Sequence, residues 1–321
     1  MNRHHAYCII AHNDEYCLET LIELIDDERN DIYLLIDKKA PAEFAKNIRP
    51  RKASMYVVPV EERIDIRWGD ISLAEAEMLV LEKAVRSGKR YDYIHLLSGN
   101  DLPLKTQDEI YGFFEGVKEG SNFLEISVGE EIEQNLKNDT SYQYILTRHQ
   151  RKVGTGLWPT ARLFMARVLR HLFIKAQKLV GYKRKWGDWK LARGINWASL
   201  SHDFAAYIVE NKELVRKKFK RVRIVDEIYK QTIAVNSPFD STILAFSRGN
   251  SEGIRLIDWG RGNQKGNPKT WTDDDWDEID SAFEIFARKF SSTQGRGVID
   301  RLKAKLLKGR ERIPENEKKV L

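Results

Sequence analysis

Short apolar runs that alternate with helix-like segments constrain the fold of this chain more than any other feature. Four runs in its first third have the length and composition of buried strands: residues 6–11, 31–37, 54–59 and 91–99. Between these runs, residues 15–27 and 72–87 repeat apolar side chains at the spacing of a helix. Strand-helix alternation is typical of parallel sheets. We therefore expect an α/β fold in which helices flank a mostly parallel central sheet.

The rest of the chain is expected to add one strand and several helices. The expected elements are a strand at 121–128, an amphipathic helix at 159–180, a strand, a turn and a helix within 194–210, a helix at 224–238, and a helix at 273–289 that Thr272 caps. With 321 residues, of which 42% are hydrophobic, the chain is long enough to bury one large core.

The predicted helix at 159–180 separates two kinds of side chain. Its basic residues share one side: Arg162, Arg167, Arg170, His171, Lys175 and Lys178. The other side is apolar, so this helix could either pack on the core or lie on a membrane surface. Packing on the core is the first expectation.

The net charge of +6 arises from basic residues that concentrate in 148–193, 212–223 and 301–319. Such a surface suits nucleic acid, anionic lipid or a phosphorylated small molecule, and it is also typical of solvated helix faces. Only two cysteines occur, and neither a transmembrane run nor a signal peptide is visible. We therefore expect a cytoplasmic protein that does not rely on disulfides.

Several common ligand-binding motifs are missing from the sequence. It contains no G-x-x-x-x-G-K-[ST], no G-x-G-x-x-G after the first strand, no H-E-x-x-H and no C-x-x-C. Polar residues remain where predicted strands end, in AHND (11–14), IDKK (36–39) and SGND (98–101). Ligands of parallel sheets bind at this edge. Neither Asp37 nor Asp101 belongs to a D-x-D pair that would hold a divalent ion, so no metal site is expected.

Eight segments of the chain together resemble one known family. In order, they read AYCIIAHND, DIYLLIDKKA, WGDISLAEAEM, YDYIHLLSGNDLPLKT, GINWASLSHDF, VDEIYKQTIAVNSP, IRLIDW followed by NPKTWT, and FARKF. Over residues 6–290 the chain is similar to the core-2/I-branching enzyme family, which contains β-1,6-N-acetylglucosaminyltransferases and peptide O-xylosyltransferases. The resemblance implies a GT-A type glycosyltransferase fold and an inverting transferase that uses a UDP-sugar without a metal.

Under this resemblance, residues 1–290 form one catalytic domain and residues 291–321 a basic tail. Residues 1–120 would bind the nucleotide sugar, and residues 121–290 would bind the acceptor and carry out catalysis. The enzyme would move N-acetylglucosamine or xylose from a UDP-sugar to a hydroxyl of a glycan or glycoconjugate, with no cofactor. N-acetylglucosamine is the first expectation, although IRLIDW, NPKTWT and FARKF resemble the xylosyltransferase branch more closely.

The resemblance also assigns roles to individual residues. Glu227 in VDEIYKQT matches the catalytic base, which takes the proton of the acceptor hydroxyl while UDP leaves from the opposite face. Arg255 and Lys289, with Arg288 beside it, match the cationic side chains that balance the diphosphate charge in place of a metal. For Arg288 and Lys289 the alternative is compensation of a helix dipole at the end of the predicted helix.

Further residues are assigned to the two substrates. The residues expected to line the uridine pocket are Ala11, His12, Asn13 and Asp37. Asp37 could instead only start a turn. Asp101 would either bind sugar hydroxyls or fix its loop through backbone amides. Glu125 matches an acceptor-binding glutamate, and Trp197 would either stack on a sugar ring or be buried.

The chain departs from the animal members of the family, which are Golgi proteins with a membrane anchor and several disulfides. A cysteine-poor member without an anchor is similar to bacterial enzymes, so we expect a glycan or lipid-linked glycan acceptor at the inner face of the membrane. Residues 159–180 and the basic tail would then contact anionic lipid. No nucleic-acid partner is expected. The alternative is a protein that binds a glycan or an anionic polymer without turnover.

Overall fold

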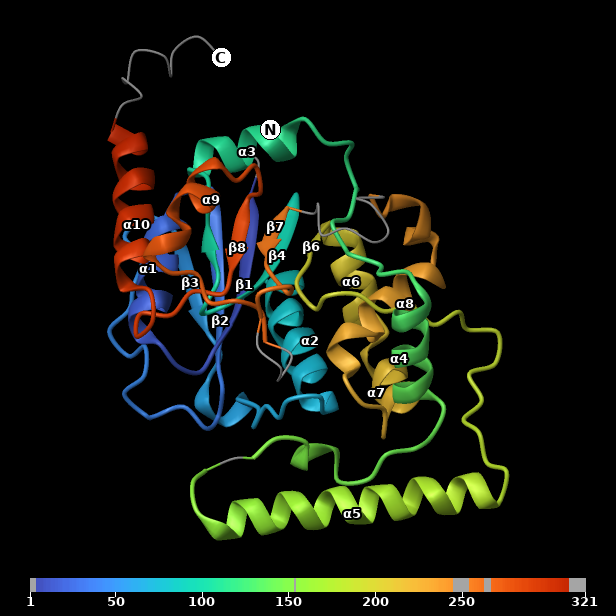
Figure 1. Ribbon diagram of the computed structural model, residues 1–321. Helices are drawn as coiled ribbons and strands as arrows, with labels where there is room; N and C mark the ends of the chain where they lie inside the picture. The colour runs from blue at the N-terminus through green and yellow to red at the C-terminus, as the bar shows by residue number, and fades with distance from the viewer. Residues whose placement is uncertain (1–3, 153, 245–253, 263–266, 312–321) are drawn as a thin grey trace.

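A five-stranded, mostly parallel sheet forms the centre of the protein (Figure 1). The computed structural model describes residues 4–152, 154–244, 254–262 and 267–311. The strand order is β3-β2-β1-β4-β6. The strands are β1 (His5–Ala11), β2 (Asn30–Ile36), β3 (Ser54–Val57), β4 (Tyr93–Ser98) and β6 (Ser199–Leu200). All neighbours pair in parallel except β4 and β6, so the predicted mostly parallel α/β sheet is confirmed.

Helices cover both faces of this sheet and complete two cores. Alternate side chains of β1 enter opposite cores, with Tyr7 and Ile9 on one face and Cys8 and Ile10 on the other. The first core includes side chains of α1 (Glu15–Leu24), α3 (Gln107–Glu115) and α10 (Arg296–Glu311). The second includes side chains of α2 (Ile71–Val85), α6 (His202–Glu210), α7 (Lys212–Phe219) and α8 (Tyr229–Val235). Burial on both faces explains why these strands read as continuous apolar runs.

A second sheet of three short strands joins distant parts of the chain. Its order is β5 (Leu102–Pro103), β8 (Phe286–Arg288) and β7 (Arg255–Ile257). The helix predicted over 273–289 is therefore wrong in its second half. The 3-10 helix η5 (Asp273–Asp275) and α9 (Trp276–Ser281) end before β8, whose pairing with strands on both sides outweighs a helical pattern.

Two other predicted elements are shorter than expected. In the predicted strand at 121–128, only Asn122 and Phe123 form isolated bridges. The predicted helix at 224–238 is divided into the 3-10 helix η3 (Val225–Glu227) and α8, and the chain then enters a second 3-10 helix, η4 (Pro238–Thr242).

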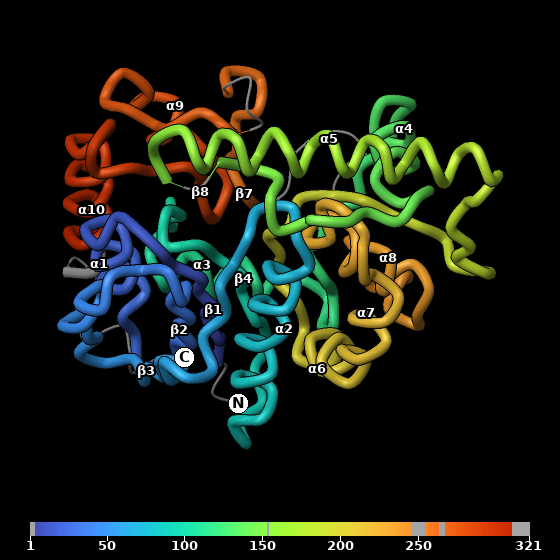
Figure 2. Tube along the Cα trace, turned by 90° about the horizontal axis from the view of Figure 1, so that it is seen from below, coloured from blue at the N-terminus to red at the C-terminus, as the bar shows by residue number. Residues whose placement is uncertain are grey.

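The long helix α5 (Leu157–Leu179) lies along one end of the molecule (Figures 1 and 2). It follows α4 (Glu130–Thr140) and the 3-10 helix η2 (Thr147–His149). Only Ala166 and Gln177 of α5 are buried, so the expectation that this helix packs on the core is wrong. Among the described residues, no helix is both long and apolar enough to cross a membrane.

Candidate functional site

The carboxyl ends of β1, β2 and β4 are held directly against one another. The backbone N–H of Asp37 donates to the carbonyl of Ala11 over 2.8 Å, and that of Gly99 donates to Ile10 over 3.0 Å. A Cβ atom at Gly99 would lie 2.9 Å from the Cβ of Ala11, so only glycine fits this close approach. The predicted uridine residues and the SGND loop therefore share one edge of the sheet.

Asp101 is buried and uses both carboxylate oxygens within the protein. One oxygen accepts from the backbone N–H of Ser98 over 2.7 Å. The other accepts from Ser98 Oγ over 2.8 Å and from Arg288 Nη1 over 2.7 Å. This geometry favours the loop-fixing role over sugar binding, because a carboxylate with these partners already satisfies its charge. Asp101 also fixes the position of Arg288.

Arg288 and Lys289 lie at the end of β8, where this second sheet meets the same edge. The Arg288 guanidinium lies 4.6 Å from the ring centroid of Trp197, which is mostly buried. No hydrogen bond or ion pair of the Lys289 ammonium is formed with the described part of the chain. Arg288 is the last residue of β8 and Lys289 directly follows this strand, so neither lies at the end of a helix and the helix-dipole alternative for them is wrong.

The charges around Lys289 make the strand ends near it a suitable anion-binding site. Burial lowers the pKa of the Lys289 ammonium, and the nearby Arg288 and Arg151 lower it further, whereas Asp14 and Asp101 raise it. A half-buried cation beside two other cations gains free energy when an anion joins it. The arrangement could therefore bind a phosphate or diphosphate.

The other predicted residues at the strand ends lie near the cationic site formed by Arg288 and Lys289. His12 and Asn13 are exposed at the end of β1. Desolvation by the surrounding protein lowers the pKa of the His12 imidazole. The charge of Asp37 raises this pKa, whereas the charges of Lys289, Lys39 and Arg288 lower it further. Asp37 accepts from the Lys39 ammonium over 2.7 Å and from the Lys39 backbone N–H over 2.9 Å. These contacts match the turn-forming alternative, and a uridine contact of Asp37 stays a prediction.

Arg255 occupies a different environment from Arg288 and Lys289. Its guanidinium is buried and donates to the carbonyl of Ala198 over 2.8 Å and to Ser199 Oγ over 3.1 Å. Burial lowers its pKa to about 10, and Asp101 opposes this shift. The structure therefore places this guanidinium against the Ser199 side chain of β6 and the backbone of the residue before it. Its predicted contact with a diphosphate stays untested.

Glu227 ends η3 and is oriented by an arginine. Its Oε2 accepts from Arg193 Nη2 over 2.5 Å, and Arg193 Nη1 also donates to Asp139 over 2.9 Å. The Glu227 side chain is 30% exposed, so solvent or a substrate can reach it. Burial raises the pKa of Glu227, and Arg193 lowers it. Glu227 is thus an accessible carboxylate in a fixed orientation.

Asp226, which sequence reasoning missed, lies next to Glu227 and is buried. Burial raises the pKa of Asp226 to about 8, and the neighbouring charges of Glu227 and Glu77 add to the shift. Beneath it, the fully buried side chains of Glu77 and Lys230 form an ion pair that fixes α2 against α8. Tyr229 donates to Glu77 over 2.9 Å. This network supports the turn that carries Glu227.

Glu125 approaches the same region through its backbone. A Cβ atom at Gly194 would lie 1.9 Å from the Glu125 carbonyl oxygen, and the Gly194 N–H donates to the Glu227 carbonyl over 2.9 Å. The Glu125 carboxylate accepts from Ser127 Oγ over 2.7 Å, and burial raises its pKa. The predicted acceptor-binding glutamate and the predicted base are therefore brought to the same part of the fold.

Arg151 lies between the two groups of residues and was not identified from sequence. Its guanidinium lies 3.8 Å from the ring centroid of Trp68. Burial lowers the pKa of Arg151, whereas the charges of Asp226 and Glu227 raise it. The charge of Arg151 in turn lowers the pKa of Lys289. The basic run RHQRK at 148–152 was its only signal. The charge of Arg151 therefore interacts both with the cationic site at the strand ends and with Glu227.

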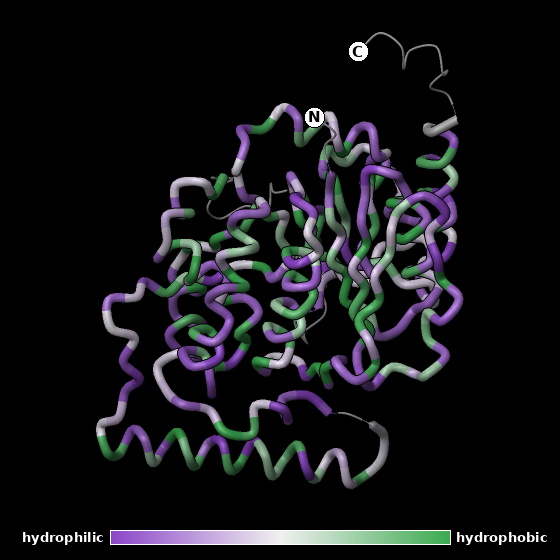
Figure 3. Tube along the Cα trace, turned by 180° about the vertical axis from the view of Figure 1, so that it is seen from behind, coloured by the Kyte–Doolittle hydropathy of each residue, from purple (hydrophilic) through white to green (hydrophobic). Residues whose placement is uncertain are grey.

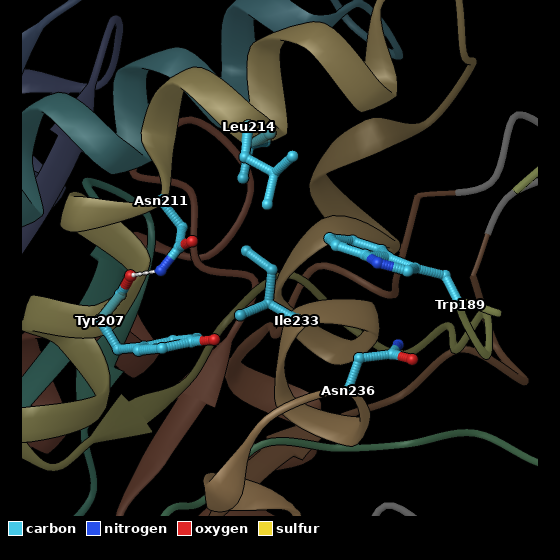
Figure 4. Close-up of a pocket in the computed structure, with 7 residues that line it drawn as sticks. Trp189, Tyr207, Asn211, Leu214, Ile233 and Asn236 are labelled. Atoms are coloured by element: carbon cyan, nitrogen blue, oxygen red, sulfur yellow. Dashed lines mark hydrogen bonds between the residues drawn. The ribbon is translucent and has the colours of Figure 1, made fainter. Parts of the chain in front are cut away.

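Two other features contribute little to this site. No group of His, Cys, Asp and Glu in the described ranges could hold a metal ion. The pocket in Figure 4 has a volume of about 20 Å³, about enough for one water molecule. It is lined by Trp189, Tyr207, Asn211, Leu214, Val215, Ile233 and Asn236, none of which is a predicted site residue.

A comparison with protein families decides the relationship of this chain. The model of the Core-2/I-Branching enzyme family matches residues 5–283. The chain belongs to the core-2/I-branching enzyme family. The match includes every predicted site residue of this family member except Arg288 and Lys289, which follow its end.

Curated relatives of this core-2/I-branching family member are glycosyltransferases by name. Xylosyltransferase oxt of Drosophila pseudoobscura pseudoobscura is 21% identical over 292 residues, which are 83% of this chain and 29% of the relative. The mouse β-1,3-galactosyl-O-glycosyl-glycoprotein β-1,6-N-acetylglucosaminyltransferase 4 is 26% identical over 123 residues, 37% of this chain and 26% of the relative. The chain thus spans less than a third of the length of these relatives. A solved structure of an active-site mutant of LgtC is 11% identical, covers 98% of this chain and 100% of its own, and has a TM-score of 0.41.

Proposed function

We propose that this chain transfers a sugar from a UDP-sugar to a hydroxyl of a glycan acceptor, with inversion and without a metal. The observation that carries this proposal is the cationic site that Lys289 and Arg288 form at the carboxyl ends of the strands. Membership of a family whose named relatives are glycosyltransferases supports it.

In the proposed reaction, the cationic residues act on the leaving group. The bond between the anomeric carbon and the UDP oxygen breaks, and its electron pair stays on the diphosphate. Lys289 and Arg288 would stabilise this developing charge, and the half-buried position strengthens the interaction relative to water.

Glu227 would act on the acceptor. Its carboxylate takes the proton of the acceptor hydroxyl, and the hydroxyl oxygen forms the new bond to the anomeric carbon from the face opposite UDP. Arg193 would keep the carboxylate oriented for this step. One base is enough, since the departing UDP needs no proton when cations neutralise it.

The donor sugar is proposed to be N-acetylglucosamine or xylose, after the names of the two groups of relatives. A screen of UDP release in excess EDTA would compare UDP-N-acetylglucosamine, UDP-xylose, UDP-glucose, UDP-galactose and UDP-glucuronate. The proteins tested would be the wild type, Glu227→Gln, and Glu213→Gln as a control. Glu213 is exposed and pairs with the neighbouring surface residue Arg216, which makes it a matched change of the same type.

We expect one of these donors to release UDP with wild type and Glu213→Gln, and release to be about 100-fold slower with Glu227→Gln. Calorimetric titration with UDP should give the same affinity for all three proteins. Normal turnover of Glu227→Gln would exclude this residue as the base. An absence of UDP binding would contradict the proposal as a whole.

A further inference from the structure

The helix α5 presents an apolar surface that no other part of the described chain covers. Nine of the seventeen large hydrophobic side chains that are exposed in the described residues lie within 157–180. Phe164, Met165 and Leu172 are 64%, 54% and 55% exposed, and Trp158 is 86% exposed. A contiguous patch of this kind on a folded protein marks a surface that contacts something else.

The apolar surface points away from the protein. Ala166 and Gln177 are buried against the body, three helical turns apart. At 100° per residue, Val168 and Leu172 project from the opposite side of the helix, with Met165 beside them. Figure 3 shows hydrophobic and hydrophilic residues alternating along this helix. Contact with the body therefore involves only the inner face of the helix.

Basic side chains flank the outward apolar stripe. Arg167, His171 and Lys178 lie along one border, Lys175 lies near it, and Arg162 lies on the other, so the expectation that the basic residues share one side of the helix is wrong. The helix contains no aspartate or glutamate. Because basic residues border the apolar stripe, the charges complement a surface that is apolar inside and anionic at its boundary.

Specific contacts hold α5 in this orientation. Gln177 exchanges two hydrogen bonds with the backbone of Gln143, at 2.8 and 2.9 Å. The Arg170 guanidinium donates inward to backbone carbonyls of Leu146 and His149, and Arg162 Nη2 lies 3.1 Å from His149 Nε2. The outward stripe is thus a fixed feature of the fold.

We propose that α5 docks this protein on an anionic lipid bilayer. The apolar stripe would enter the boundary between headgroups and acyl chains, and the flanking cations would contact lipid phosphates. A second copy of the chain fits less well, because pairing two such helices would bring basic side chains together without any acidic residue of α5 to compensate. This inference does not depend on the proposed function.

Binding to vesicles of defined composition tests the proposal. Flotation would compare vesicles of pure phosphatidylcholine with vesicles that contain about 30% phosphatidylglycerol. We expect binding only to the anionic vesicles, and weaker binding as salt increases. A first variant, Arg162→Gln/Arg167→Gln/Lys175→Gln, should bind about 10- to 100-fold more weakly. Its control, Lys46→Gln/Arg51→Gln/Lys52→Gln, removes three exposed charges elsewhere and should bind like wild type.

A second variant tests the apolar stripe. Met165→Ser/Leu172→Ser should lose most binding while keeping the thermal stability of wild type, because both side chains are exposed. Phe283→Ser, which changes an exposed side chain outside α5, is the control. Equal vesicle binding by all variants, or no binding of wild type to either vesicle, would overturn the proposal. A wild-type dimer that Met165→Ser/Leu172→Ser converts to a monomer, without vesicle binding, would assign the stripe to a second copy instead.

Discussion

At the scale of single residues, the adjacent Arg288 and Lys289 have different tasks. Arg288 is already held by Asp101 and lies over Trp197. Lys289 has no such partner in the part of the chain that the structure describes. A cation without a partner gains most from an anionic ligand, so Lys289 should contribute more to the binding of a diphosphate than its neighbour.

Replacing Lys289 with methionine should weaken UDP binding about 10- to 100-fold, the equivalent of one charged hydrogen bond. Isothermal titration calorimetry at fixed salt measures this change. Lys305→Met, which alters a surface lysine of α10 that pairs with Asp280, should bind UDP like wild type. Unchanged UDP affinity of Lys289→Met would place the nucleotide elsewhere.

Arg193 should determine the acid limit of activity. Burial raises the pKa of Glu227 and Arg193 opposes this, so Arg193→Gln should raise the Glu227 pKa further. Because Glu227, as the proposed base, would work only when ionised, the acid limb of kcat/KM should shift to higher pH. Arg193→Lys should restore part of the difference. The test is a profile of kcat/KM from about pH 5 to 9. If the acid limb has the same apparent pKa for wild type and Arg193→Gln, Arg193 does not control the ionisation of Glu227.

Asp226 should make stability fall as pH rises. Its pKa is about 8 in the folded protein and about 4 when unfolded, so the folded state binds more protons between these values. This contribution to stability is complete below about pH 4 and is lost as pH rises through about 8. Asp226→Asn should therefore reduce the loss of unfolding free energy between about pH 5 and 8 in urea titrations. Equal losses in both proteins would show that Asp226 does not titrate there.

The sequence could nominate Glu227 and Lys289 because each belongs to a segment that resembles a known family. Arg193 and Arg151 lie outside the segments that carry the resemblance, and Asp226, although it lies in the same segment as Glu227, was assigned no role by it. Their significance depends on which side chains the fold places beside them, and Arg193 is 34 residues from Glu227 along the chain. Charge counts identified a basic region but not the one guanidinium that orients a carboxylate.

At the scale of elements, the strands that could be predicted from the sequence are those that are long and buried. Strands β1, β2 and β4 were predicted because burial on both faces leaves a continuous apolar run. The three residues of β8 were missed, since so short a strand carries no periodicity that distinguishes it from a helix. The outward stripe of α5 was visible as a pattern, yet only the fold shows which side faces away.

The ion pair between α2 and α8 should be costly to break from one side. Lys230→Met leaves the buried Glu77 carboxylate without its partner and should lower the unfolding free energy by about 3–5 kcal/mol. Lys230→Met/Glu77→Leu should recover much of this loss. Urea unfolding of the full double-mutant cycle provides the measurement. Lys83→Met, which breaks a more exposed pair with Glu62, is the control and should cost about 1 kcal/mol or less.

At the scale of the whole molecule, UDP should stabilise the entire fold. The proposed donor site combines residues from the ends of β1, β2, β4 and β8, so a ligand there binds only the folded chain. At about 100 times its Kd, UDP should add about 2.7 kcal/mol to the unfolding free energy. Thermal unfolding should show this shift equally with EDTA and with manganese, and single-stranded DNA should give none. A shift that requires manganese would contradict the proposed metal independence of the reaction.

The pairing of β5 with β8 has a consequence for how the protein is made. Arg288 and its partner Asp101 are 187 residues apart, so a ribosome that adds about 5–20 residues per second separates them by about 10–40 s. During this interval, β1, β2 and β4 have left the ribosome, whereas the cations proposed to hold the diphosphate have not. The growing chain would therefore be unable to recruit nucleotide as a folding aid until β8 emerges.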